Sequence, residues 1–286
     1  GVEAGRATGD APPTTGGMGH DLWRDAAPLA RTAATEAVHS SELFAARARE
    51  VIAAAPRDAP FFLYYAAQTP HAHYVGAPGR HLAAAADAGF AEAEPRFAVA
   101  ALVSALDEQV GAVVDAVASH RGGDHAWDDA VLWFMGDNGP EPGTGASSHP
   151  LRGAKRTLFE GGVREPSFVY APGRLDPGRV AAPLHVVDVL PTLLGFANAA
   201  RDDETTRATT TTTARRLDGV DARALWADAA AASGEDGGRI LVVAYDNVND
   251  CGAVLKGTRF KYVLNAACGA SSLDFVRWEA DADDDA

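Results

Sequence analysis

The chain has 286 residues, of which 47% are hydrophobic and 22% are charged, and its net charge is −14. This length suits one large domain with a small appendage, and the hydrophobic share is enough for a sizeable core. The acidic balance excludes a general surface for nucleic acid or anionic membranes, so a local group of cations points to a small anionic ligand.

The N-terminal part of the sequence predicts a flexible segment followed by a helix. Residues 1–20 are rich in Gly, Pro and Thr, a composition typical of mobile segments. Residues 40–55 place apolar side chains at helical spacing, with Ser40 or Ser41 as the expected cap, and Pro56 ends the pattern. The face that this helix should bury consists of Phe44, Ala48, Val51 and Ile52.

Three apolar runs and a second helix predict the main sheet. Residues 60–70, 130–135 and 166–173 are continuously apolar, which is typical of strands that are buried on both faces. Between the first two runs, residues 96–119 repeat apolar side chains at helical spacing. This alternation predicts a parallel sheet covered by helices, and therefore an α/β domain over residues 21–200.

The last third of the chain has a different composition. Residues 201–216 are low in complexity and predict a linker. Residues 217–286 contain short strands with turn signals, which predict a small antiparallel subdomain with a hairpin at 252–264. Cys251 and Cys268 flank this hairpin, and both a disulfide between them and two free thiols are open.

An Asp-Asn pair follows the second apolar run. Asp137 and Asn138 come directly after that run, at the end of a strand where ligands of α/β sheets bind. Their carboxylate and amide oxygens are hard donors, which suit Ca²⁺ or Mg²⁺ better than zinc or copper. The alternative is that Asn138 and Gly139 merely form a tight turn.

Cations gather shortly after this strand end, at Arg152, Lys155, Arg156 and Arg164. The chain has only three lysines among its 25 basic residues, so a lysine here is notable. Its ammonium is a compact point charge that can hold a tetrahedral oxyanion. The alternative is a solvated cation on a surface loop.

Other candidate groups lie on either side. His71 and His73 follow the first apolar run, and either imidazole can titrate near neutrality and protonate a leaving group. Two residues at this spacing point to opposite sides of an extended chain, and we prefer His71 by its position. Glu160 and Arg164 are interpreted as a structural ion pair in a turn, where the two glycines between them adopt unusual backbone angles.

Taken together, these segments resemble the sulfatase family, the formylglycine-dependent sulfuric ester hydrolases of the alkaline phosphatase superfamily, and most nearly its arylsulfatase B-like members. The resemblance runs from about residue 20 to the C-terminus and rests on five stretches in the family's order. These are "PFFLYYAAQTPHAHYVGAPGR", "VLWFMGDNG", "HPLRGAKRTLFEGGVREPSFVYAPG", "HVVDVLPTLLGFA" and "LDGVDARALW".

The resemblance implies an alkaline phosphatase-like α/β fold, with a mixed, mostly parallel sheet between helices and a small C-terminal antiparallel sheet. It implies that Asp137 and Asn138 coordinate Ca²⁺, with Mg²⁺ as the alternative, and that Lys155 and His71 hold the sulfate. His71 would protonate the departing oxygen of a small or carbohydrate sulfate ester.

The sequence departs from the family at the nucleophile. That residue is a formylglycine made within a Cys/Ser-x-Pro-x-Arg motif that precedes all five stretches in the family. Neither Cys251 nor Cys268 begins such a motif, and no serine ahead of these stretches does. The early Asp pair of the metal shell is also missing. We therefore expect the formylglycine upstream of this chain, a chain that is inactive alone, and a sheet with an uncovered edge or face.

Two alternatives stay open. One is a phosphatase or phosphodiesterase of the same superfamily, although these commonly use two zinc ions and have Asp-His-Gly where this chain has Asp137, Asn138 and Gly139. The other is a catalytically inactive relative that binds sulfated glycans. The resemblance implies a secreted or lysosome-like location, and we expect neither a nucleic-acid partner nor a membrane span; the oligomeric state is open.

Overall fold

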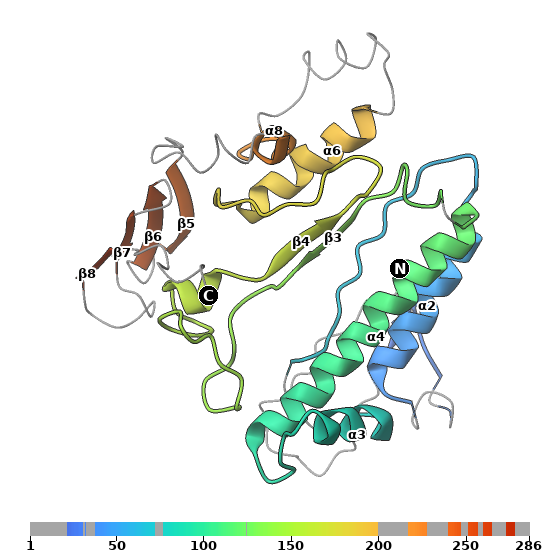
Figure 1. Cartoon of the computed structure of the whole chain (residues 1–286), viewed down its shortest axis with the longest axis horizontal. Coiled ribbons are helices and arrows are strands. Elements are labelled where there is room, and N and C mark those ends of the chain that lie inside the picture. Colours follow the sequence, from blue (N-terminus) through green and yellow to red (C-terminus); the bar gives the residue numbers. More distant parts are fainter. Residues whose placement is uncertain are drawn as a thin grey trace. The chain divides into compact units, whose positions relative to one another are not determined.

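The computed structural model describes residues 22–30, 32, 38–71, 77–123, 125–199, 217–227, 240–246, 251–256, 260–264 and 273–277. The chain divides into two compact units (Figure 1). Unit 1 comprises Gly1–Ala126 with Thr144–Ala146, and unit 2 comprises Trp127–Gly143 with Ser147–Ala286. The predicted N-terminal segment 1–20, the linker 201–216 and Cys268 lie outside the described residues, so the predicted domain boundaries stay predictions.

Unit 1 is built around three helices, which Figure 1 shows beside one another. These are α2 (Ser40–Ala54), α3 (Gly79–Asp87) and α4 (Pro95–Arg121), and both α2 and α3 pack against α4. A short antiparallel pair, β1 (Trp23–Arg24) and β2 (Ala27–Pro28), precedes them. The sequence predicted α2 and α4 but not α3, which is short and rich in alanine.

The start of α2 differs from the prediction. His39 is its N-cap, and the Nδ1 atom of this residue accepts a hydrogen bond from the backbone N–H of Ser41 at 3.3 Å. Ser40 and Ser41 already belong to the helix, so neither has the extended backbone that a cap requires. Burial lowers the pKa of His39, which favours the neutral imidazole that can accept this bond. The predicted buried face is confirmed for Phe44, Ala48 and Ile52.

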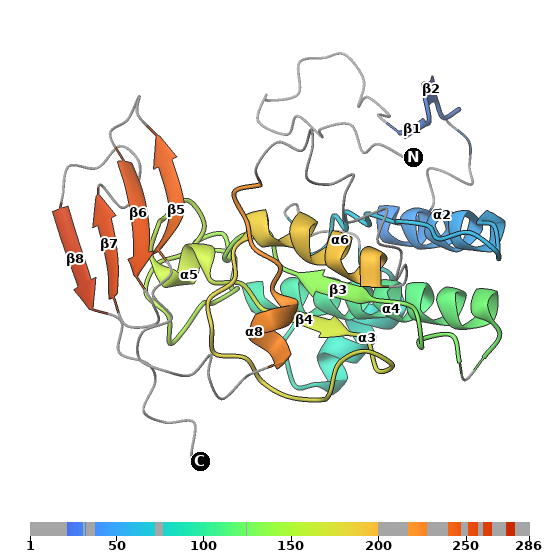
Figure 2. The ribbon, with the colours of Figure 1, turned by 90° about the horizontal axis from the view of Figure 1, so that it is seen from above.

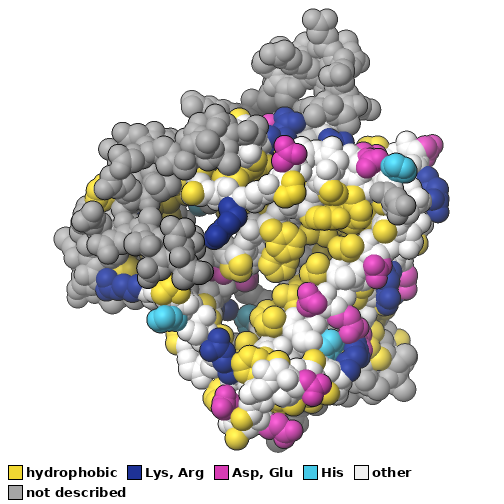
Figure 3. Space-filling view, viewed as in Figure 1, with side chains coloured by type: hydrophobic (Ala, Val, Ile, Leu, Met, Phe, Trp, Pro, Cys, Tyr) yellow, Lys and Arg dark blue, Asp and Glu magenta, His cyan; other side chains and the backbone are white. Residues whose placement is uncertain are grey.

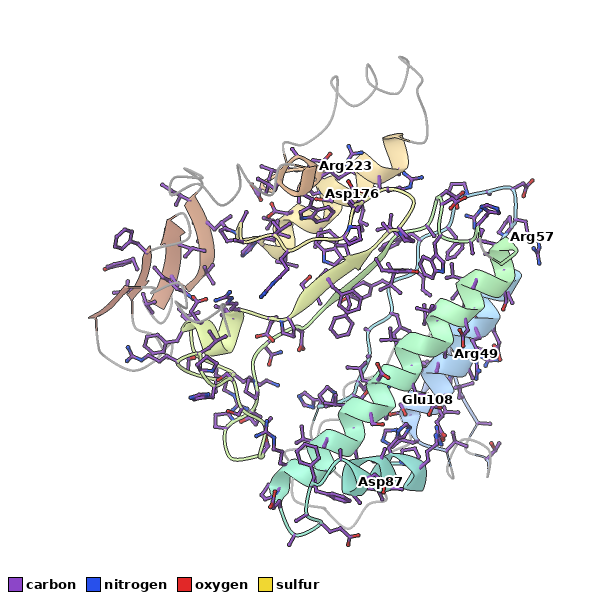
Figure 4. All side chains as sticks on the ribbon, in the orientation of Figure 1. Arg49, Arg57, Asp87, Glu108, Asp176 and Arg223 are labelled. Carbon is purple, nitrogen blue, oxygen red and sulfur yellow. The ribbon has the colours of Figure 1, made fainter. Side chains whose placement is uncertain are left out.

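Helix α4 begins and ends where its sequence dictates. Pro95 occupies its first turn, where a missing N–H costs nothing. Gly122 ends it in the left-handed conformation, at φ 100°, and donates to the carbonyl of Ala118 at 3.1 Å. Arg57 secures this end by donating to the carbonyl of His120 at 2.7 Å (Figure 4).

Among the described helices, α4 alone has the length and apolar composition to cross a membrane. The helix nevertheless packs against α2 and α3 within unit 1. Its Glu108 also receives two hydrogen bonds from Arg80 of α3, both at 2.8 Å. Such contacts are those of a packed helix, and the absence of a membrane span stays a prediction.

The predicted buried strand at residues 60–70 is wrong. The segment is extended but pairs with no described strand, and its side chains alternate between partial burial and exposure. Phe62 and Tyr64 are 75% and 81% exposed. Without ladder neighbours on either side, nothing among the described residues covers these alternate side chains.

Side-chain hydrogen bonds hold this segment on α4 instead. Tyr65 donates to Oε1 of the buried Gln109 at 2.6 Å, and Gln109 Nε2 donates to Thr69 at 2.7 Å. Burial raises the pKa of Tyr65 to about 12, so its phenol remains a donor at neutral pH.

Unit 2 contains the other two predicted strands, β3 (Leu132–Met135) and β4 (Ser167–Tyr170). They pair antiparallel, with Met135 opposite Ser167, so the predicted parallel arrangement is wrong for this pair. A parallel neighbour needs a long crossover connection, usually a helix. The loop between β3 and β4 contains only α5 (Glu160–Val163), so the chain turns back beside the strand it has just left.

Aromatic side chains join this strand pair to two helices, α6 (Val189–Ala199) and α8 (Arg223–Ala227). The rings of Trp133 and Trp226 meet edge to face at 5.4 Å between centroids. The Trp226 ring also lies 6.0 Å from the ring of Phe196 on α6. Aromatic contacts of this kind contribute beyond the apolar area that they bury.

Two buried polar groups connect the segments on either side of the predicted linker. Asp188, at the end of η1 (Val186–Asp188), is fully buried and accepts from the N–H of Val220 at 2.9 Å. Thr192 on α6 is equally buried and accepts from the N–H of Ala222 at 2.9 Å. The two motifs that flank the linker therefore pack together, because each buried group is satisfied by the other segment's backbone.

The predicted C-terminal antiparallel sheet and its hairpin are confirmed. Four strands pair in chain order, as Figure 2 shows, and each pair is antiparallel. One face is buried at Ala253, Leu255 and Val263, whereas Tyr262 and Val242 are exposed on the other. The strands are β5 (Ile240–Asp246), β6 (Cys251–Lys256), β7 (Phe260–Leu264) and β8 (Leu273–Arg277).

The expected uncovered apolar surface is also found. Hydrophobic side chains are open to solvent over the described part of the face in Figure 3. On the strands of unit 2, Phe168 is 50% exposed and Tyr170 is 44% exposed. Large apolar side chains exposed at alternate positions of one strand are uncommon on the surface of a monomeric protein.

We predict that Tyr65→Phe destabilises unit 1 by about 1–3 kcal/mol, because the buried Oε1 atom of Gln109 loses its donor. Urea unfolding followed by circular dichroism of the helices measures the change. Tyr64→Phe is the matched control, since that ring is exposed, and it should leave the free energy of unfolding unchanged. Equal effects of the two variants would contradict the network.

Candidate functional site

The Asp-Asn pair lies between two backbone hydrogen bonds that extend the β3–β4 ladder. Gly136 donates to the carbonyl of Pro166 at 3.1 Å, and Gly139 donates to the carbonyl of Gly162 at 3.1 Å. Asp137 is exposed and Asn138 is half-buried. The strand end is therefore held on both sides while the Asp137 side chain remains accessible.

Glycines bring the strand end and the following loop into direct backbone contact. A Cβ atom on Gly139 would lie 1.9 Å from the carbonyl oxygen of Gly161, and one on Gly162 would lie 2.2 Å from that of Thr157. The unusual backbone angles expected at the double glycine are not found, because both residues are helical in α5. They are required for close approach, since any side chain would collide with backbone.

The loop that carries Lys155 is attached to the same strand end. The N–H of Lys155 donates to the carbonyl of Pro140 at 3.0 Å, two residues beyond Asn138. Thr157 closes the turn around it by donating to the carbonyl of Ala154 at 2.8 Å. The structure thus attaches the backbone of Lys155 to the segment that follows Asp137 and Asn138, and the joint role of these residues stays a prediction.

The other cations near Lys155 are engaged in packing or pairing. The guanidinium of Arg152 stacks on the Phe159 ring, 3.9 Å from its centroid. Arg156 has a left-handed backbone, at φ 71°, and pairs with Glu141. A guanidinium used in these ways serves the loop itself.

Glu160 does not form the predicted local pair with Arg164. Its carboxylate instead binds Lys261 of β7, with Oε1 and Nζ 2.8 Å apart; Lys261 is buried and Glu160 is partly buried. Arg164 contacts Glu160 only through the backbone, by donating to its carbonyl at 2.8 Å. The prediction that Glu160 is structural holds, but its partner comes from 101 residues away.

Sequence reasoning missed Glu165. The β3–β4 register, continued past Met135 and Ser167, sets Glu165 opposite Asp137. Burial raises the pKa of Glu165, and the negative charge of Asp137 raises it further. An antiparallel pairing of the two runs would have revealed this neighbour, but the sequence pattern favoured parallel strands.

The oxygens at this strand end fit a hard divalent cation. The Oε1 atom of Glu165 is buried without a hydrogen-bond partner, an arrangement that a nearby positive charge would satisfy. Asp137 and Asn138 add a carboxylate and an amide oxygen, the donors that Ca²⁺ and Mg²⁺ prefer. Among the described residues, no group of three or more His, Cys, Asp and Glu side chains could hold a metal ion.

His71 belongs to a different unit from Asp137, Asn138 and Lys155. It belongs to unit 1, is exposed, and follows the 60–70 segment, where its N–H donates to the carbonyl of Gln68 at 2.9 Å. His73 lies outside the described residues. The role of His71 beside Lys155 therefore stays a prediction.

Comparison with protein families decides the assignment. A family model described as Sulfatase matches residues 11–199. The chain belongs to the sulfatase family. The strand end, the Lys155 loop and α6 all lie within the matched range.

Individual sulfatases match about half of the chain. Arylsulfatase J of Mus musculus is 31% identical over 171 residues, which cover 58% of this chain and 27% of that protein. Arylsulfatase A of Homo sapiens is 36% identical over 160 residues, which cover 54% of this chain and 29% of that protein. The chain thus spans less than a third of the length of these relatives.

A solved structure confirms the fold class. Ps i-CgsB, in complex with k-i-k-neocarrahexaose, superposes with a TM-score of 0.65 at 22% identity, over 85% of this chain and 48% of that chain. The predicted alkaline phosphatase-like α/β class is therefore correct, with helices and small antiparallel sheets as the described part of it.

We predict that Gly139→Ala destabilises unit 2 by about 3 kcal/mol, because the added methyl group meets backbone that cannot move aside cheaply. Urea unfolding followed by tryptophan fluorescence measures this change. Gly178→Ala is the matched control, since nothing lies within 4 Å of its added Cβ, and it should change the free energy by less than about 0.5 kcal/mol. A neutral Gly139→Ala variant would overturn the close backbone contact.

Proposed function

We propose that this chain is part of a sulfatase that hydrolyses sulfate esters, and that its strand end and following loop form one side of the active site. The observation that supports this proposal is the hydrogen bond from the backbone N–H of Lys155 to the carbonyl of Pro140, because it attaches the Lys155 backbone to the segment that follows Asp137 and Asn138. Sulfatase relatives match this region of the chain.

Lys155 would bind an oxygen of the sulfate group. A lysine ammonium offers three donors and a compact charge, which suits a tetrahedral anion. The backbone bond at its own N–H fixes where the side chain starts, so little further ordering is needed on binding. The neighbouring Arg152 and Arg156 would support the loop through Phe159 and Glu141.

Asp137 and Asn138 would coordinate the divalent cation, Ca²⁺ in preference to Mg²⁺, with Glu165 as a further carboxylate at the same strand end. When bound, such a cation offsets the negative charge that builds up on the sulfate oxygens. The unsatisfied buried oxygen of Glu165 supports this proposal. An amide at position 138, where zinc-dependent relatives have an imidazole, disfavours a two-zinc phosphatase.

His71 would donate a proton to the departing alcohol or phenol oxygen. An imidazole has the pKa range for this task near neutrality, and its exposed side chain is open to a ligand. Because His71 belongs to the other unit, its approach to Lys155 is the part of the proposal that most needs a direct test.

The nucleophile would come from outside this sequence. No Cys here begins a Cys/Ser-x-Pro-x-Arg motif, and no Ser does ahead of the 60–70 segment, where the family has it. We therefore propose that the formylglycine belongs to a part of the protein upstream of these residues. The chain alone would then bind sulfate esters without turning them over. This departure also favours a second candidate, a sulfated-glycan binder without activity. The resemblance favours a secreted or lysosome-like location for either.

We predict that Lys155→Met lowers the affinity of the chain for sulfate about tenfold, because it removes the ammonium from the anion site. Titration followed by NMR or calorimetry, at fixed ionic strength, measures the dissociation constant. Arg156→Met is the matched control, since that cation pairs with Glu141, and it should change affinity less than threefold. Equal losses would indicate non-specific charge attraction and would reject the proposed site.

We predict that Ca²⁺ at ten times its dissociation constant stabilises the chain by about 1.4 kcal/mol, and that Asp137→Asn removes this effect. Thermal unfolding with and without Ca²⁺ measures the shift. Asp107→Asn, an exposed carboxylate on α4, serves as the control and should keep the stabilisation. Binding of two zinc ions per chain in place of Ca²⁺ would favour the phosphatase alternative.

A further inference from the structure

The C-terminal sheet contributes a buried charge to the loop that carries Lys155. Lys261 on β7 is only 3% exposed, and its Nζ atom lies 2.8 Å from Oε1 of Glu160. Burial lowers the pKa of Lys261, although the carboxylate of Glu160 opposes this effect. A lysine this deeply buried is rare unless it is paired.

An apolar cluster surrounds the pair. Leu158 from the loop packs with Ala253 and Val263 from the sheet, and all three are buried. Apolar contact of this kind is non-directional and would hold the sheet against the loop without any charge. The ion pair adds a requirement of direction, because a charged hydrogen bond is short and sensitive to angle.

Glu160 stands at the point where the parts of the proposed site meet. The next residue, Gly161, donates to the carbonyl of Arg152 at 2.7 Å, which closes the loop containing Lys155. The residue after that, Gly162, accepts from the N–H of Gly139 at the strand end. A shift of Glu160 would therefore move both bonds together.

We propose that Lys261 is a positioning residue for Lys155, and that the C-terminal sheet is thereby a working part of the sulfate-binding site. The ion pair fixes Glu160, Glu160 fixes the backbone of α5, and α5 sets the loop and the strand end relative to each other. This inference rests on the proposed function for its biological meaning, but the positioning itself is testable without a substrate.

The test is hydrogen exchange of single backbone amides in the whole chain, measured by NMR. In Lys261→Met, the protection of the amides of Gly161 and Lys155 should fall at least tenfold more than that of Gly136, which is bonded to Pro166 in the same unit. An equal fall at all three amides would mean a general loss of stability and would overturn the proposal, as would no fall at all.

A double variant separates position from stability. Lys261→Met combined with Glu160→Met replaces the buried ion pair by an apolar pair, a change that often restores stability. We expect the melting temperature to recover while the protection of Gly161 and Lys155 stays low. Recovery of both would show that apolar packing alone positions the loop, and would overturn the inference.

Two further variants complete the design. Lys261→Arg keeps a charged donor and should hold amide protection within about threefold of the parent, which also serves if Lys261→Met does not fold. Arg80→Met removes an exposed cation that pairs with Glu108 in unit 1 (Figure 4) and should leave the Gly161 amide unchanged. A fall in protection with Lys261→Arg equal to that with Lys261→Met would reject a role for the charge.

Sulfate titration of the same variants keeps the two proposals distinct. If Lys261→Met weakens sulfate binding about as much as Lys155→Met, the positioning reaches the ligand. If the amides respond as expected but the parent chain binds no sulfate, the positioning stands and the proposed function fails. If sulfate binds but the amides do not respond, the proposed function stands and the positioning role of Lys261 fails.

Discussion

The contact between Gly139 and the backbone of Gly161 and Gly162 is the constraint on which the candidate site depends. Because hydrogen atoms replace side chains here, the strand end and the loop approach closely enough for direct backbone hydrogen bonds. Asp137 and Asn138 precede this contact in the chain, and Lys155 lies in the loop that makes it. A sulfate site of the kind we propose would gain its order from this backbone contact.

The antiparallel return of β4 beside β3 adds an electrostatic feature to this geometry. It sets Glu165 opposite Asp137, and two carboxylates facing each other disfavour the folded state unless a cation or a proton lies between them. A divalent cation held here, as we propose, would offset this repulsion.

The rest of unit 2 supports the loop from the opposite side. The C-terminal sheet is apolar where it meets Leu158 and charged where Lys261 meets Glu160. One face of that sheet therefore packs against the loop. The uncovered rings of Phe168 and Tyr170 agree with a chain that spans less than a third of its sulfatase relatives.

The sequence by itself determined the two long helices, the strands β3 and β4, the C-terminal hairpin and the family, because each depends on contiguous residues with a local period or motif. Asp137, Asn138 and Lys155 could be selected for the same reason. Only the tertiary structure decided the direction of β4, and with it the place of Glu165, and the pairing of Glu160 with Lys261 across 101 residues. These features depend on register and on long-range packing, for which a local sequence pattern carries no information. For the same reason the sequence pattern did not reveal that the 60–70 segment pairs with no described strand.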